Sequence, residues 1–211
     1  MKTKLLLIAT ALLLTGATTF AAGKARLSIG HLDIAVGYEA GDFTLTLHDD
    51  DTTDTGYEAG AAIVVVVPAA KTTVLDDPAF GFLGAPNVPV WVLPETQSTN
   101  LAFLGFGADD LASGIFSNDT VRVQLVKVSG PGEMALYNLD AFGLPRLVMN
   151  TRDGIYSNDR FDITAGGDAH QNFAFSKPGF YRVTFQATGT LVNGTVIRTK
   201  KTTYLIEVRR N

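Results

Sequence analysis

The sequence predicts an all-β protein, an antiparallel β-sandwich of the immunoglobulin-like kind with long loops rich in proline and glycine. Period-two alternation of apolar and polar residues dominates the chain, and the 3.6-residue period of helices is almost absent. About ten to twelve short apolar runs are separated by turn residues, the spacing typical of a sandwich. Asn193-Gly194 lies between two such runs and is the strongest hairpin signal in the chain.

The chain opens with the pattern of a secretory signal peptide. Lys2 and Lys4 lie just before an apolar run over residues 5–14, which is too short to span a bilayer. We therefore expect residues 1–22 to be a signal peptide, with no membrane span after its cleavage. Residues 23–211 are expected to form a single β-sandwich domain, because about 190 residues fit one domain of the larger all-β kind.

The composition indicates the compartment and limits the partners. The 211 residues include no cysteine, so an exported chain of this kind relies on its core rather than on disulfides. We expect an exported protein that is periplasmic, extracellular or at the cell surface. The net charge is -4 and no basic stripe is present, which argues against a nucleic-acid partner.

In the first half of the chain, alternation predicts a hairpin of residues 26–36 and 43–47. Residues 61–67 are continuously apolar and rich in valine, as expected for a strand buried on both faces. Residues 76–99 contain many prolines and glycines and are expected to be irregular. The exception is a strand around Trp91, which we expect to anchor the core or a sheet edge.

In the second half, strands over residues 120–129 and 133–139 flank the turn Gly130-Pro131-Gly132. Further strands are predicted over residues 146–149, 161–163, 171–175, 180–190 and 195–208. The acidic residues 49–58 do not have the spacing of an EF-hand, and we expect them to form a solvated loop.

The chain has three histidines, His31, His48 and His170. If the first hairpin turns at Glu39-Ala40, His31 lies directly opposite His48. Opposed residues share a face, with Cβ atoms about 4.5–5.5 Å apart, whereas a shift of one residue would place them on opposite faces. Asp168 points the same way as His170 if residues 168–170 are extended.

Three imidazoles, with or without a nearby carboxylate, suit zinc or copper by ligand type. The sequence therefore predicts a metal site formed by His31, His48, His170 and Asp168. The alternative is a group of polar residues that are hydrogen-bonded or unrelated and hold no metal.

Sequence motifs for catalysis are absent. The chain has no cysteine nucleophile, no Gly-x-Ser-x-Gly elbow, no phosphate loop and no His-Glu-x-x-His helix. A zinc ion with an open position can activate water, but Asp33 and Asp49 are candidate bases by proximity alone. We therefore predict a protein that is not an enzyme, with a metal-dependent hydrolase as the less favoured interpretation.

Eight segments of the chain resemble, in order, one known family. They are residues 30–34, 47–50, 77–86, 90–97, 129–132, 135–137, 140–143 and 170–175. With motifs such as Gly30-His31-Leu32-Asp33-Ile34 and His170-Gln171-Asn172-Phe173, the chain resembles the surface-anchored protein domain of the actinobacterial type, also called the choice-of-anchor M domain. The resemblance covers nearly the whole mature chain.

The resemblance implies an exported, β-rich domain carried on cell-surface proteins and often encoded beside metal-type ABC transporters. A metal ABC transporter system or another cell-surface component is then the implied partner. The chain departs from the family in two respects. Residues 207–211 carry no apolar tail or sorting signal, so we expect no anchor there, and Asp168 and Phe173 stand where the family has histidine and tryptophan. A carboxylate also ligates zinc, so the metal site stays predicted. The alternative is a structural or adhesive surface module without metal.

Overall fold

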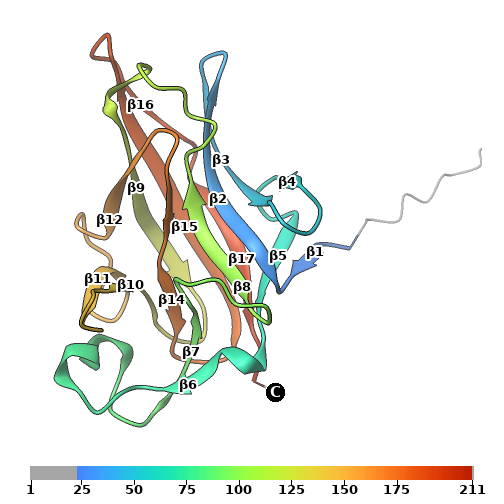
Figure 1. Cartoon of the computed structure of the whole chain (residues 1–211), viewed down its shortest axis with the longest axis vertical. Helices are drawn as coiled ribbons and strands as arrows, with labels where there is room; N and C mark the ends of the chain where they lie inside the picture. The colour runs from blue at the N-terminus through green and yellow to red at the C-terminus, as the bar shows by residue number, and fades with distance from the viewer. Residues whose placement is uncertain (1–22, 211) are drawn as a thin grey trace, which may run out of the picture.

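Seventeen strands and two short 3₁₀ helices build residues 23–210, the part of the chain that the computed structural model describes (Figure 1). The strands form three sheets that pack as a sandwich, so the predicted all-β fold is confirmed. The predicted signal peptide, residues 1–22, lies outside the described residues. Within residues 23–210, no helix is long and apolar enough to cross a membrane.

A seven-stranded sheet contains the two longest strands of the fold, β9 and β15, which pair along most of their length. Its path runs in the order β1 (Ala25–Leu27), β5 (Ala62–Val66), β17 (Thr202–Val208), β15 (Gly179–Leu191), β9 (Phe116–Ser129) and β12 (Arg160–Thr164), with β16 (Val196–Arg198) paired to β15. This sheet brings the end of the chain beside segments near its start.

A five-stranded sheet carries all three histidines and is called the histidine sheet below. Its strands lie in the order β13 (Asp168–His170), β8 (Ala102–Gly107), β2 (Gly30–Glu39), β3 (Asp42–Asp49) and β4 (Thr55–Tyr57). The strands β2, β3 and β8 lie side by side in Figure 1.

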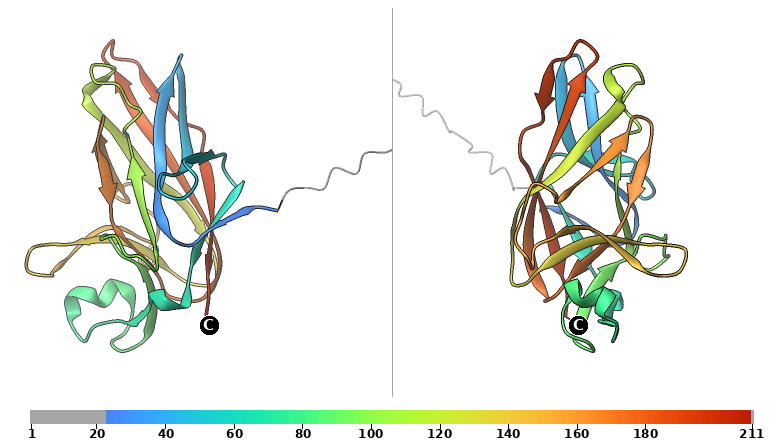
Figure 2. Two further views of the ribbon diagram at one scale, coloured as in Figure 1. Left: turned by 45° about the vertical axis from the view of Figure 1, so that its right-hand side comes forward. Right: turned by 90° about the vertical axis from the view of Figure 1, so that its left-hand side faces the viewer.

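A second five-stranded sheet is connected to the histidine sheet through β13 and β14, which are separated only by Gln171. Its strands lie in the order β11 (Pro145–Asn150), β10 (Met134–Leu139), β14 (Asn172–Phe175), β7 (Pro89–Leu93) and β6 (Lys71–Thr73). The 3₁₀ helices η1 (Pro68–Ala70) and η2 (Pro78–Leu83) flank β6. The hairpin of β10 and β11 projects from the body (Figure 2), and Phe142 in its loop is 90% exposed.

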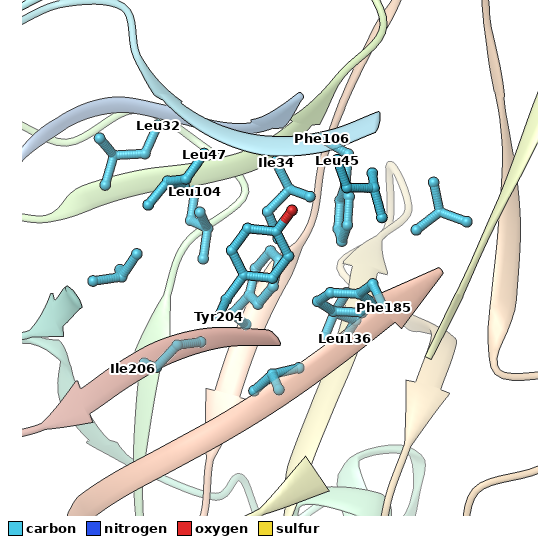
Figure 3. Close-up of a cluster of buried hydrophobic side chains, with 14 of the residues drawn as sticks. Leu32, Ile34, Leu45, Leu47, Leu104, Phe106, Leu136, Phe185, Tyr204 and Ile206 are labelled. Carbon is cyan, nitrogen blue, oxygen red and sulfur yellow. The ribbon is translucent and has the colours of Figure 1, made fainter. Parts of the chain in front are cut away.

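The main core contains side chains from all three sheets. Figure 3 shows the labelled residues of β2, β3 and β8 opposite those of β15 and β17, namely Leu32, Ile34, Leu45, Leu47, Leu104 and Phe106 against Phe185, Tyr204 and Ile206. All nine side chains are buried, and each large apolar side chain buried in this way contributes about 1.5–3 kcal/mol. The inner face of the histidine sheet is therefore apolar, and its polar residues lie on the outer face.

Three strand pairings are parallel, so the prediction of a purely antiparallel sandwich is wrong in this detail. The parallel pairs are β1 with β5, β5 with β17, and β2 with β8. Parallel neighbours need a long crossover connection, and these partners lie far apart in the chain. Alternation within a segment reveals which face is buried but does not identify a distant partner.

Three local predictions are confirmed. All five residues of β5 are buried, as the continuous apolar run predicts. Trp91 is 4% exposed and belongs to the core. Asn193-Gly194 forms the expected turn, with Gly194 at a φ of 86° and the Leu191 amide donating to the Thr195 carbonyl. The last predicted strand, however, is divided into β16 and β17.

Candidate metal centre

A row of residues crosses the outer face of the histidine sheet. His170 on β13 is paired with Gly105 on β8, Gly105 with Asp33 on β2, and Asp33 with His48 on β3. His31 lies two residues before Asp33 on the same strand, so both side chains point to the same face. Segments from three parts of the chain thereby meet on one surface.

Alternation along β2 explains why polar groups face outward here. Leu32 and Ile34 are 0% and 2% exposed and belong to the core, so His31 and Asp33 point to the opposite face. Burial is nevertheless unequal on the outer face. The side chain of His31 is 26% exposed, while that of Asp33 is only 5% exposed.

Two glycines of β8 make room for the side chains that cover them. A Cβ at Gly105 would lie 2.5–2.7 Å from three atoms of the His170 ring, so only glycine allows the ring to lie against this strand. A Cβ at Gly107 would lie 3.3 Å from an Asp109 oxygen and 3.4 Å from Asp33. The ring of His170 also stacks on Phe103, with centroids 3.6 Å apart.

His31 and His170 meet through their Nε2 atoms, which are 2.9 Å apart. Asp33 lies beside both rings, with its Oδ2 3.1 Å from His31 Nε2 and its Oδ1 3.6 Å from His170 Nε2. Asp168 completes the group, since its Oδ2 is 3.7 Å from His170 Nε2. Because β13 is extended, Asp168 and His170 share a side of the strand, as expected from their spacing.

The predicted pairing of His31 with His48 is wrong. The hairpin turns at Ala40-Gly41, both with positive φ, rather than at Glu39-Ala40, so Asp33 and not His31 lies opposite His48. The register differs from the prediction by two residues, which keeps His31 and His48 on the same face. His48 contacts Asp50 instead, with Nδ1 2.6 Å from Oδ1.

The backbone at His170 is held by a hydrogen-bonded pair of side chains. Asn138 Nδ2 donates to the His170 carbonyl at 2.9 Å and to Glu95 Oε2 at 2.7 Å. Glu95 Oε1 in turn accepts from the Leu139 amide at 3.0 Å. These contacts tie β13 to the projecting β10–β11 hairpin and fix the position of His170.

Burial sets the protonation of the group. It raises the pKa of the Asp33 carboxyl to about 7, opposed by the charge of His31 and assisted by the nearby carboxylates of Asp50, Asp168 and Asp109. Burial and the neighbouring His31 lower the pKa of His170. A neutral imidazole keeps a free nitrogen lone pair, which metal coordination requires.

Within residues 23–210, two sets of three side chains offer ligand atoms that lie within 4.8 Å of one another. One set is His31, Asp168 and His170, and the other is His31, Asp33 and Asp50. The structure therefore brings together three of the four predicted ligands and leaves His48 outside both sets. Asp33 Oδ1 is buried and has no hydrogen-bond partner among the residues that the structure describes, a state that costs free energy unless a cation or donor compensates it.

Asp33 and Asp50 are absent from the predicted ligands although the sequence contains a signal for both. Each lies two residues after a histidine, and the same alternation that places Asp168 with His170 places Asp33 with His31 and Asp50 with His48. Gly105 has no comparable signal. Its role depends on the pairing of β8 with β13, where its partner His170 lies 65 residues further along the chain.

No protein-family model matches the chain, and no curated protein matches it in sequence. The resemblance to the surface-anchored protein domain therefore stays a prediction.

Proposed function

We propose that this chain is an exported, non-catalytic β-sandwich domain that binds one transition metal ion, zinc or copper, through His31, His170 and Asp168. The domain is proposed to lie in the periplasm, outside the cell or at the cell surface. Its site is proposed to serve metal uptake, as an accessory to a metal ABC transporter system. The resemblance supports the compartment and the partner, and the geometry of the site supports the metal.

One observation carries the proposal, the approach of His31 Nε2 and His170 Nε2 to 2.9 Å. At zinc–nitrogen distances of about 2.0–2.1 Å and a tetrahedral angle, two ligand nitrogens lie about 3.3 Å apart. The two nitrogens are therefore slightly closer than this value, whereas Asp168 Oδ2 and His170 Nε2, 3.7 Å apart, are slightly farther apart. Small rotations of these side chains would therefore suffice to surround an ion.

The experiment is native mass spectrometry of the mature protein after exposure to zinc or copper. The wild type is expected to hold metal stoichiometrically, and His170→Ala is expected to hold one ion fewer. Asp153→Asn, which removes a carboxylate in an exposed turn, is the matched control and should bind as the wild type does. A wild-type protein without stoichiometric zinc or copper would overturn the proposal.

A second candidate is a structural or adhesive surface module that binds no metal. It is favoured by the hydrogen-bond contacts that need no metal, between the Nε2 atoms of His31 and His170 and between His48 Nδ1 and Asp50 Oδ1. In that case His170→Ala would lower the free energy of unfolding and leave partner binding intact. Neither the wild type nor the variant would hold metal.

A further inference from the structure

Two strands of the histidine sheet each carry one histidine and one aspartate, separated by a single residue. On β2 these are His31 and Asp33, and on β13 they are Asp168 and His170. The two strands flank β8, where Gly105 is the register partner of both Asp33 and His170. Because Gly105 has no side chain, nothing from β8 separates the carboxylate of Asp33 from the ring of His170.

The carboxylate of Asp33 faces both imidazole rings. Its Oδ2 is 3.1 Å from His31 Nε2, and its Oδ1 is 3.6 Å from His170 Nε2. The two nitrogens are themselves 2.9 Å apart, so one oxygen of the carboxylate stands beside each of them. An ion that the two rings share is therefore within reach of Asp33.

The separations between these ligand atoms are close to those of a tetrahedral zinc site. Four ligand atoms at about 2.0–2.2 Å from zinc lie about 3.3–3.6 Å apart. The separations in the structure are 2.9 Å between the two rings, 3.1 and 3.6 Å from Asp33 to the rings, and 3.7 Å from Asp168 to His170. Ligand atoms of His31 and Asp168 also lie within 4.8 Å of each other. Asp33 thus lies as near to the rings as Asp168 does.

Burial distinguishes Asp33 from the carboxylates around it. Its side chain is 5% exposed, whereas that of Asp168 is 52% exposed. Within residues 23–210, its only ion-pair partners are the two histidines, and its Oδ1 has no hydrogen-bond partner. A buried carboxylate without a donor is costly, and a cation between it and the two rings compensates its charge.

We propose that Asp33 is the fourth ligand of the ion held by His31, His170 and Asp168, and that this ion is divalent zinc rather than monovalent copper. The inference rests on the proposed function and decides between the two metals that it names. Four protein ligands leave no open coordination position, as in zinc sites that bind the ion without catalysis.

The ligand set matches zinc both in charge and in chemical type. Two neutral imidazoles and two carboxylates carry two negative charges, which a divalent ion neutralises and a monovalent ion compensates only by half. Monovalent copper is selected by thiolate and thioether ligands, whereas imidazole and carboxylate are ligands of zinc. The chain has no cysteine, and two of its three methionines, Met134 and Met149, lie in the core.

Competition titrations of the metal-free protein with Zn²⁺, and with Cu⁺ under reducing conditions without oxygen, test this proposal. The wild type is expected to bind one ion and to prefer Zn²⁺. Asp33→Asn should weaken zinc binding more than about 100-fold, beyond the 10–100-fold that the loss of an outer partner costs, without a comparable loss for Cu⁺. Asp109→Asn is the matched control, because Asp109 is an exposed carboxylate that lines the same cleft as Asp33 and lies outside both ligand sets. It should change the zinc affinity less than about tenfold.

Cobalt substitution counts the ligands in the wild type itself, so the proposal stays testable if Asp33→Asn does not fold. Four-coordinate Co²⁺ absorbs strongly in the visible range, and azide alters its spectrum where an open coordination position lets azide bind. Azide should leave the spectrum of the wild type unchanged and should alter that of Asp33→Asn. Circular dichroism establishes whether each variant is folded.

The outcomes separate this inference from the proposed function. A loss of zinc affinity below about 100-fold in folded Asp33→Asn, or a wild-type spectrum that azide alters, overturns the role of Asp33 and leaves the proposed function in place. A wild type that prefers Cu⁺ to Zn²⁺ overturns the assignment of the metal. A wild type that binds neither zinc nor copper overturns both proposals.

Discussion

The imidazole of His170 lies against the backbone of Gly105, its register partner on β8, and a Cβ at position 105 would stand 2.5 Å from the Cε1 atom of that ring. This contact determines where His170 Nε2 lies, and hence its distance of 2.9 Å from His31 Nε2. A glycine in the middle of a strand weakens the strand, and it is typical of a place where another group approaches closely.

The first prediction concerns this contact. Gly105→Ala forces the His170 ring away from β8 and out of reach of His31, so the affinity for zinc should fall at least about tenfold, the equivalent of about 1.4 kcal/mol. Overpacking should also lower the free energy of unfolding by about 1–3 kcal/mol. Calorimetry and urea unfolding measure the two effects. Gly81→Ala, with no atom within 4 Å of the new Cβ, is the control. Wild-type zinc affinity in Gly105→Ala would contradict the assigned role.

The second prediction concerns the core beneath the site. Phe106 is fully buried, and its ring lies 5.0–5.9 Å from those of Phe161, Phe173 and Phe185. Phe106→Ala should therefore lower the free energy of unfolding by about 3–5 kcal/mol, measured by urea denaturation. The same substitution at Phe142, which is 90% exposed, should change it very little. Equal losses in the two variants would be incompatible with the described core.

The fold and the site differ in how far the sequence predicts them. Alternation reveals the inner and outer faces of β2 and β3, because it is a property of each strand alone. It also keeps His31 and His48 on one face although the turn lies one position away from the expected place. The meeting of His170 with His31 depends on β8 lying between their strands. No local pattern encodes such a pairing of distant segments.

The third prediction concerns the side chain that holds the His170 backbone. Asn138→Ala leaves the His170 carbonyl and Glu95 Oε2 without this donor, so the free energy of unfolding should fall by about 1–3 kcal/mol. Zinc affinity should fall as well, because β13 is no longer tied to the β10–β11 hairpin. Urea denaturation and calorimetry measure both quantities. Asn158→Ala, in an exposed turn, is the matched control and should alter neither. Unchanged stability in Asn138→Ala would remove Asn138 from the support of the site.

The fourth prediction concerns the pH dependence of the metal-free protein. The pKa of Asp33 rises from 3.8 to about 7 on folding because the carboxyl is buried, so between these values the folded protein binds the additional proton. Its contribution to the free energy of unfolding is therefore present at low pH and is lost as the pH rises towards 7. The lowered pKa of His170 acts in the opposite direction below its ordinary value of 6.5, so the wild type must be compared with Asp33→Asn. Urea unfolding in the presence of a chelator gives the free energy of unfolding of both proteins at pH 5 and at pH 7. From pH 5 to pH 7 this free energy should fall further, or rise less, in the wild type than in Asp33→Asn. An identical change in both proteins would mean that Asp33 titrates in the folded protein as it does in the unfolded chain.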